Sequence, residues 1–243
     1  MKNVLILGAT SDMAQAVARR FAAEGWSLTL AARDPNALTS LAADLRIRAA
    51  AEVHTAAFDA LAFEEHARFY RDLPARPDVV ICAFGYMGIN EEAFTDVEEM
   101  RRTIDTNFTG AVSILNVIAA DFEKRRRGTI VGISSVAGDR GRQSNFIYGS
   151  AKAGFSAYLS GLRNRLWRAG VHVMTVKPGF CRTKMTENLD LPPALTAEPE
   201  QVAEAIWKGI RKRRNTIYVL WMWRWIMLLI RLIPEPIFKR MNL

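Results

Sequence analysis

The chain has 243 residues, half of them hydrophobic, which is enough to bury one good core and fits a single domain. No linker or internal repeat divides it. Lys and Arg outnumber Asp and Glu by 33 to 25, but the whole excess lies in residues 208–243, and residues 1–207 are balanced. Because the body of the chain carries no net charge and no recognition motif, a nucleic-acid partner is disfavoured.

Predicted strands and helices alternate along the chain. In order they are strand 4–7, helix 12–24, strand 27–32, helix 35–46, strand 52–58, helix 61–72, strand 79–84, helix 97–125, strand 129–134, helix 146–168, strand 171–177 and helix 199–213. This alternation predicts an α/β fold in which a doubly wound parallel sheet is covered on both faces. Ligands of such sheets bind outside the carboxyl ends of the strands, where Gly8, Ala83, Ser135 and Pro178 fall.

The first turn is a candidate phosphate site. The apolar run Val4–Leu7 predicts a buried strand, and the small residues Gly8–Ala14 separate it from an apolar helical pattern. A strand, a small-residue turn and a helix N-terminus together bind phosphate groups. Only Gly8 stands where a dinucleotide loop usually carries three glycines, so an ordinary strand–helix turn remains the alternative.

Ser135, Tyr148 and Lys152 suggest proton transfer to or from an alcohol or ketone. Tyr148 and Lys152 are four residues apart, so on a helix the ammonium lies on the same face as the phenol. We expect this cation to lower the phenol pKa towards neutrality, while Ser135 holds the substrate oxygen. Neither hydroxyl accepts a hydride, so the chemistry requires a cofactor that does.

These residues and several others occur in the order typical of the short-chain dehydrogenase/reductase family, and the chain resembles that family over nearly its whole length. The matching segments are Gly8–Ala14, Asn107, Ile133–Ser135 with Tyr148 and Lys152, and Pro178–Thr183. The thirteen-residue spacing to Tyr148 selects Ser135 over Ser134 as the catalytic serine.

The resemblance implies a Rossmann-type fold and a role for each matching residue. Asn107 would lie in a bulged helix and anchor a water that links Lys152 to solvent, and Thr183 would hold a nicotinamide carboxamide. The implied cofactor contacts are Gly8, Thr10, Ser11, Asp12, Met13, Ala83, Gly85, Lys152, Pro178, Gly179 and Thr183. Helices 97–125 and 146–168 resemble those that build a dimer or tetramer in the family.

A narrower resemblance points to a lipid-linked substrate. Ala83–Gly85, Gly138–Arg142 and the basic, aromatic C-terminus are similar to decaprenylphosphoryl-2-keto-erythro-pentose reductases, which complete an epimerisation to the arabinose form. Arg140 and Arg142 would then meet the lipid phosphate, although two arginines in a loop are more often simply solvated. A soluble ketone, or loss of turnover in a nucleotide-binding homologue, remains the alternative.

The end of the second strand indicates NADPH rather than NADH. Arg33 follows the position where an NAD enzyme places a carboxylate, and arginine favours a 2′-phosphate. Asp34 precedes Pro35 and is better explained as an N-cap. Asp59 resembles the family's adenine-binding aspartate, with a plain strand-end cap as the alternative.

The C-terminus divides the chain into a reductase domain, residues 1–215, and an amphipathic extension, residues 216–243, that begins with the last strand. Residues 217–233 are apolar apart from Arg224 and Arg231 and contain three tryptophans. A bilayer span needs about 20 uncharged residues, so residues 217–240 suit a membrane surface better. A subunit contact and a cover over the substrate pocket are the alternatives.

The remaining signals concern location and metals. Cys82 and Cys181 are too few for a disulfide framework and suit packing thiols in a reducing cytosol. His54, His66 and His172 are scattered, so we expect no metal site. Without an apolar leader after the first residue, we expect a cytoplasmic protein at the inner face of the membrane.

Overall fold

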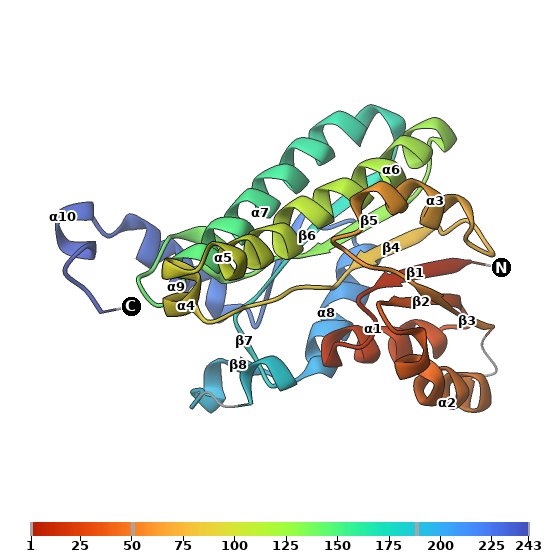
Figure 1. Cartoon of the computed structure of the whole chain (residues 1–243), viewed down its shortest axis with the longest axis horizontal. Coiled ribbons are helices and arrows are strands. Elements are labelled where there is room, and N and C mark those ends of the chain that lie inside the picture. Colours follow the sequence, from red (N-terminus) through yellow and green to blue (C-terminus); the bar gives the residue numbers. More distant parts are fainter. Residues whose placement is uncertain (1, 50–51, 188–189, 243) are drawn as a thin grey trace.

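The computed structural model describes residues 2–49, 52–187 and 190–242, so the outer limits of the two predicted parts, residues 1 and 243, lie outside it. Its centre is a parallel seven-stranded sheet in the order β3-β2-β1-β4-β5-β6-β9 (Figure 1). The strands are β1 (Asn3–Leu7), β2 (Ser27–Ala32), β3 (Val53–Ala57), β4 (Val79–Cys82), β5 (Thr129–Ile133), β6 (His172–Pro178) and β9 (Thr216–Val219). The chain reverses its winding between β1 and β4, as in a doubly wound Rossmann-type sheet.

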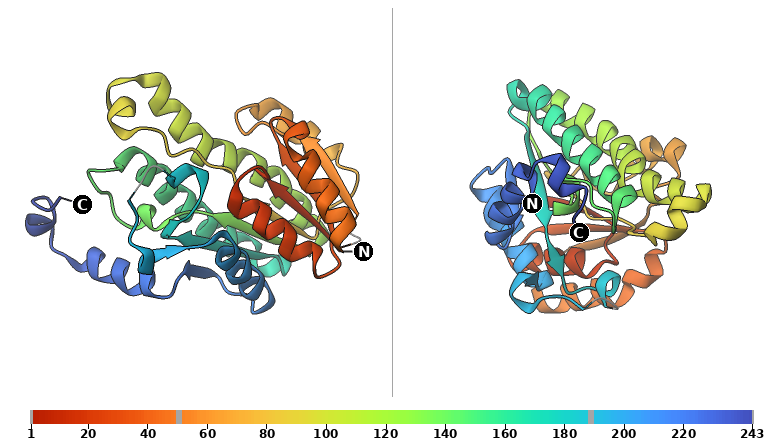
Figure 2. Two further views of the ribbon diagram at one scale, coloured as in Figure 1. Left: turned by 90° about the horizontal axis from the view of Figure 1, so that it is seen from below. Right: turned by 90° about the vertical axis from the view of Figure 1, so that its left-hand side faces the viewer.

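Helices cover both faces of this sheet, and the right-hand view of Figure 2 shows the two layers end-on. One layer contains α1 (Asp12–Ala22), α2 (Thr39–Ala49) and α8 (Pro199–Arg211). The other contains α3 (His66–Arg71), α5 (Val97–Ile104), α6 (Gly110–Arg125) and α7 (Phe146–Leu166). This arrangement confirms the predicted α/β class.

Each layer buries its own half of the core. In the first, Phe21 of α1 meets Trp26 and Trp207 edge-to-face, each with ring centroids 5.1 Å apart. In the second, Phe122 and Phe155 pack on the opposite face of the sheet. Burying aromatic and branched side chains against both faces is the main stabilising contribution in such a fold.

Both cysteines lie in this packed interior. Cys82 ends β4 and Cys181 lies in β7 (Phe180–Cys181), and both are buried free thiols. Burial raises the pKa of each thiol to about 12. The two side chains are therefore protonated at neutral pH and pack as small apolar groups.

The long helix predicted over 97–125 is interrupted. The structure has α5, then a π-helical turn Asp105–Thr109, then α6. At the junction Gly110 packs on the carbonyl of Ala60, an approach that leaves no room for a Cβ. The start of α6 therefore packs against the β3–α3 connection. Helix periodicity in the sequence does not reveal this interruption.

Several short elements were not predicted. They are α4 (Asn90–Thr95), the 3₁₀ turn Val136–Asp139, and the two-stranded pair of β7 with β8 (Thr196–Ala197). Helix α2 also begins later than expected, because a 3₁₀ turn, Pro35–Leu38, precedes it. All are too short to produce a repeating hydrophobic pattern.

After β9, the chain continues into α9 (Met222–Leu232) and α10 (Glu235–Phe238), which lie beyond the carboxyl ends of the strands (Figure 1). Among the helices of the described ranges, none has the length and apolarity needed to cross a bilayer.

Two helical glycines test the close approach at the π turn. Gly161 of α7 is exposed and a Cβ there would meet nothing within 4 Å, whereas a Cβ on Gly110 would collide with the carbonyl of Ala60. We expect Gly161→Ala to stabilise the fold by about 0.5–1 kcal/mol. Gly110→Ala should destabilise it by about 1–3 kcal/mol, because backbone cannot move aside easily. Urea unfolding of both variants measures the difference, and equal stability would show that the two helices tolerate the extra methyl group alike.

Candidate active site

A cavity of about 350 Å³ opens at the carboxyl ends of β1, β4 and β5. It collects most of the predicted cofactor contacts and two of the predicted catalytic residues. These are Gly8, Thr10, Ser11, Asp12, Met13, Arg33, Asp59, Ala83, Gly85, Tyr148, Lys152 and Thr183. The predicted residues outside its lining are Asn107, Ser135, Arg140, Arg142, Pro178 and Gly179.

The turn after β1 has the geometry of a phosphate site. Gly8 has a φ of +80°, and a Cβ there would lie 2.6 Å from the backbone nitrogen of Phe84, so only glycine fits. The Ser11 hydroxyl caps α1 by accepting a hydrogen bond from the Ala14 N–H at 3.2 Å. Glycine is therefore required at position 8, where the turn after β1 passes close to the backbone of Phe84. The N-terminus of α1 faces the cavity.

The catalytic candidates meet at the start of α7. The Ser135 side chain lies beside the phenol of Tyr148, where it favours the ionised form, and its oxygen accepts a hydrogen bond from the Ala137 N–H at 3.1 Å. The Ser134 hydroxyl points elsewhere, donating to the carbonyl of Lys152 at 3.0 Å. This difference supports Ser135 as the serine that shares a substrate oxygen with Tyr148.

The expected lowering of the Tyr148 pKa is not what the structure shows. Burial raises the pKa of Tyr148 to about 12, and only the neighbouring Ser135 side chain acts in the opposite direction. Lys152 Nζ lies 5.6 Å from the Tyr148 ring centroid and donates to the Ile133 carbonyl at 3.2 Å. Burial also lowers the pKa of Lys152 to about 8. The ammonium therefore loses its proton more easily than an exposed lysine does, and it stabilises a phenolate less.

Asn107 occupies the π-helical turn, in agreement with the bulged helix implied by the resemblance. Its side chain is buried and pairs with Tyr86: Oδ1 accepts from the Tyr86 N–H at 3.2 Å, and Nδ2 donates to the Tyr86 carbonyl. Nδ2 also donates to the Thr103 carbonyl at 2.8 Å. Asn107 therefore holds the chain after β4 in place beside Lys152.

Gly85 allows these groups to meet. A Cβ on Gly85 would lie 3.0 Å from Asn107 Oδ1 and 3.4 Å from Lys152 Nζ. A larger side chain would push apart the two groups on which the predicted water link depends. The glycine of Ala83–Gly85 thus leaves space for two of the candidate catalytic residues and also lines the cavity.

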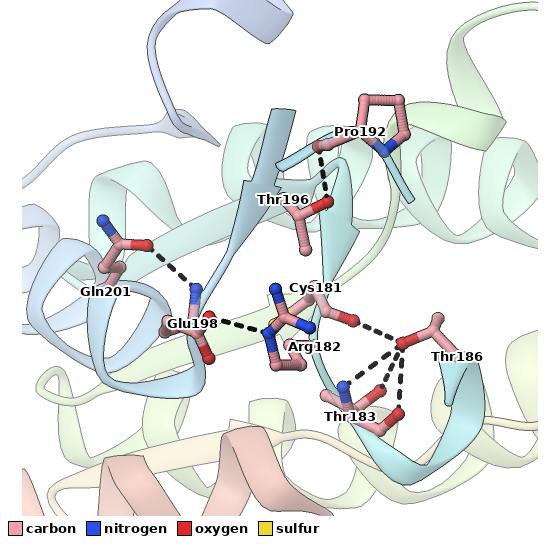
Figure 3. A network of polar contacts seen from close by, with 8 residues as sticks. All are labelled: Cys181, Arg182, Thr183, Thr186, Pro192, Thr196, Glu198 and Gln201. Atoms are coloured by element: carbon pink, nitrogen blue, oxygen red, sulfur yellow. Dashed lines mark hydrogen bonds and ion pairs between the residues drawn. The ribbon is translucent and has the colours of Figure 1, made fainter. Parts of the chain in front are cut away.

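The segment with Thr183 is a folded turn held by Thr186 (Figure 3). The Thr186 hydroxyl accepts from the Thr183 N–H at 3.2 Å and bonds to the carbonyls of Cys181 and Thr183. Across the cavity, Asp12 Oδ2 accepts from the Lys184 N–H at 2.8 Å. The residue after the predicted nicotinamide residue is therefore bonded to the predicted phosphate turn.

Pro178 and Gly179 lie at the carboxyl end of β6, as expected, but outside the lining of the cavity. Pro178 ends β6, and Gly179 lies under the indole ring of Trp223, where a Cβ would overlap the ring. The glycine is thus required by the C-terminal helix α9, whose position the sequence does not reveal.

Three residues near the ends of β2 and β3 were considered as cofactor contacts or caps. Asp34 accepts from the Asn36 N–H at 2.9 Å and caps the 3₁₀ turn, so it is an N-cap as expected. Arg33 lines the cavity and its side chain has no hydrogen bond or ion pair with any residue that the structure describes. Asp59 accepts from the Leu61 N–H at 3.0 Å and also lines the cavity, which is compatible with both roles considered for it.

Arg140 is not a free loop arginine. Its Nη1 donates to the carbonyls of Ile230 and Ile233, each at 2.6 Å, and Nη2 pairs with Glu235 at 2.9 Å. These contacts use the guanidinium to bind the C-terminal helices, so the predicted phosphate role does not fit Arg140. Arg142 differs: its guanidinium is half-buried, burial lowers its pKa, and Nε has no partner among the described residues.

Some lining residues were not predicted from the sequence. Tyr86 and Arg102 lie together, with the guanidinium 4.2 Å from the ring centroid, and Lys184 and Met185 line the cavity beside Thr183. Tyr86 directly follows the Ala83–Gly85 motif, so that motif could have indicated it. Arg102 lies in α5, one turn before the π turn, and has no comparable signal.

The buried ammonium of Lys152 makes a pH-dependent prediction. Its folded-state pKa is lowered from 10.5 to about 8, so charging it opposes folding below pH 8 and this penalty fades as the pH rises towards 10.5. We expect Lys152→Met to be more stable than the wild type at pH 7 by up to about 3 kcal/mol, and the gap to narrow by pH 10. Unfolding by urea at both pH values measures it, with exposed Lys124→Met as the control. A gap that widens with pH would contradict the burial argument.

The chain is similar to known oxidoreductases over nearly its whole length. The sequence profile described as short chain dehydrogenase matches residues 2–193. An uncharacterized oxidoreductase of Mycobacterium tuberculosis is 36% identical over 241 residues, which cover 98% of this chain and 96% of the relative. An uncharacterized oxidoreductase of Streptomyces coelicolor is 39% identical over 243 residues, covering 99% and 96%.

Two further similar proteins have more specific descriptions. A serine 3-dehydrogenase of Agrobacterium fabrum is 30% identical over 228 residues, covering 89% of this chain and 86% of the relative. The solved structure of a short-chain dehydrogenase from Sphingobium yanoikuyae in complex with NADPH superposes with a TM-score of 0.84 at 28% identity, covering 94% and 92%. The chain therefore belongs to the short-chain dehydrogenase family and is one of its oxidoreductases.

Proposed function

We propose that the protein reduces a ketone to a secondary alcohol by hydride transfer, with Ser135, Tyr148, Lys152 and Asn107 as its catalytic set. The observation that carries this proposal is that Tyr148 and Lys152, one helical turn apart, both line the cavity, with the Ser135 side chain beside the phenol. A bound nicotinamide cofactor supplies the hydride to the carbonyl carbon.

The ionisation of Tyr148 favours the reductive direction. Because burial raises the pKa of Tyr148 to about 12, the phenol carries its proton at neutral pH. Tyr148 and Ser135 donate hydrogen bonds to the ketone oxygen, which polarises the carbonyl. As the carbon accepts the hydride, the oxygen takes the proton of Tyr148 and becomes the alcohol hydroxyl.

Lys152 and Asn107 return the proton. The pKa of Lys152, about 8, places this ammonium close to neutrality, so it can give a proton to the Tyr148 phenolate and recover one from solvent. We assign Asn107 to the water that connects Lys152 with solvent, because Asn107 and Lys152 both lie against Gly85.

NADPH is the proposed cofactor. The unpaired Arg33 at the cavity offers a guanidinium to a 2′-phosphate, and the Gly8 turn with the α1 N-terminus offers a site for the pyrophosphate. The similar dehydrogenase of Sphingobium yanoikuyae is described in complex with NADPH.

For the substrate we propose a polyprenyl-phosphoryl 2-keto-pentose. Residues 1–215 would form the reductase domain, and the extension from residue 216 would bring it to the inner face of a membrane, where such a lipid resides. Arg142 is the candidate for the lipid phosphate, since its buried Nε lacks a partner among the described residues. A homodimer or homotetramer built on α5, α6 and α7 completes the proposal.

Tyr148→Phe tests the chemistry. Removal of the phenol oxygen should lower turnover about 10²–10⁴-fold, because the ketone oxygen loses its proton donor, while NADPH binding persists. The assay follows NADPH loss with polyprenyl-phosphoryl 2-keto-pentose and with a panel of soluble ketones. Tyr158→Phe is a matched control on the same helix, since its hydroxyl only donates to Asn116 Oδ1 at 2.9 Å.

The pattern of turnover distinguishes the alternatives. Activity with soluble ketones alone would replace the lipid-linked substrate by a soluble one. A wild type that binds NADPH but reduces nothing would favour a nucleotide-binding homologue without catalysis.

Arg33→Ala tests the cofactor. Loss of the guanidinium should raise the KM for NADPH by about tenfold or more and leave the KM for NADH nearly unchanged, because only NADPH carries the 2′-phosphate. Steady-state kinetics with both cofactors measures the ratio. Equal changes in the two values would exclude Arg33 from the selection.

A further inference from the structure

Helix α9 exposes an apolar ridge although the protein buries apolar residues well elsewhere. Five large side chains of this ridge are 42–73% exposed: Trp221, Trp225, Leu228, Leu229 and Leu232. Their spacing of i, i+4, i+7, i+8 and i+11 places them on one face of the helix. Contiguous exposed apolar surface of this kind marks an interaction site.

The opposite face of α9 is buried, so the helix cannot turn its ridge inwards. Trp223 and Met227 are 4% and 0% exposed and pack on Val136, the residue after Ser135. The Trp223 Nε1–H donates to the Leu195 carbonyl at 3.0 Å. One face of α9 is therefore fixed on the 3₁₀ turn Val136–Asp139, and the other face is exposed.

Arg140 fixes the far end of α9. Its guanidinium binds the last carbonyls of the helix and Glu235, as described above, and lies 3.7 Å from the ring centroid of Phe238 in α10. The Arg140 side chain is only 14% exposed. The two C-terminal helices are thus a defined surface, and both Figure 1 and the left-hand view of Figure 2 show α10 standing away from the body of the molecule.

The charges beside the ridge select its partner. Arg224 and Arg231 border the ridge seven residues apart, and Lys239 and Arg240 follow α10, all exposed and none in an ion pair with a described residue. Glu235, the one carboxylate between Lys208 and the C-terminus, is occupied by Arg140. A second copy of the chain would bring like charges together, whereas an anionic lipid surface accepts both the cations and the apolar ridge.

The location of the ridge connects it to the active site. Strand β9 ends at Val219 and α9 begins at Met222, so the helix lies at the carboxyl edge of the sheet, where the cavity opens. A surface that binds this ridge therefore also faces the side of the molecule on which substrate enters.

We infer that α9 and α10 form a docking face for an anionic lipid surface, with the ridge inserted among the acyl chains and the flanking cations at the headgroups. This deepens the proposed function, because it specifies the surface at which that substrate would be met. Its test requires no turnover, so failure to bind lipid can be distinguished from failure of the proposed reductase chemistry.

The test uses the full-length protein and sedimentation with extruded vesicles. One set contains equal parts of phosphatidylcholine and phosphatidylglycerol, and the other contains phosphatidylcholine alone. We expect wild type to bind the anionic vesicles in preference, and Leu229→Gln plus Leu232→Gln to weaken binding at least tenfold. Arg224→Gln plus Arg231→Gln should weaken binding to anionic vesicles about 25-fold, since each cation near such a surface strengthens binding about fivefold.

Ile47→Gln is the matched control, because Ile47 is an 83% exposed apolar residue on α2, away from the tail. It should bind as wild type does, and unchanged thermal unfolding of all variants should verify their folding. No binding by wild type, equal binding to both vesicle types, or unchanged binding by the ridge variant would overturn the inference. The inference would also be overturned if wild type bound no vesicles but formed a concentration-dependent dimer that the ridge variant abolished. The ridge would then bind a second copy of the chain.

Discussion

The carboxyl edge of the sheet is organised around the burial of one cation. Lys152 is 4% exposed, and an ammonium removed from water destabilises the fold unless polar groups surround it. The Ile133 carbonyl accepts its hydrogen bond, and Gly85 leaves the space that Nζ needs. The π turn then brings Asn107 to the same place, so β4, β5, α7 and the α5–α6 junction all meet at this ammonium.

A second constraint links this edge to the C-terminus through two neighbouring residues of opposite charge. Asp139 is almost fully buried, pairs with Lys177 of β6 and accepts from the Tyr218 hydroxyl of β9 at 2.8 Å. Arg140 then binds α9 and α10. Asp139 ends the 3₁₀ turn that follows Ser135, and Arg140 comes directly after it, so the C-terminal extension is attached to the candidate active site as well as to the sheet.

Much of the fold and of the site was predictable from local pattern. Alternating strands and helices required a two-sided parallel sheet, and the Tyr148–Lys152 spacing required one helix face. The interactions that were missed are long-range in sequence: Arg140 meets residues about ninety positions away, and Gly179 meets Trp223. The direction of the Tyr148 pKa shift was also predicted wrongly, because burial depends on neighbours that a motif does not specify.

The sequence by itself determined the class of fold, the order of its elements, the candidate residues for the chemistry and the concentration of positive charge in the tail. These properties follow from periodicity, spacing and composition, which are local. Only the tertiary structure decided the ionisation of Tyr148 and Lys152, the engagement of Arg140 by the C-terminal helices, and which face of α9 remains exposed. Each of these depends on desolvation and on contacts between distant segments, and those arise only when the chain is packed.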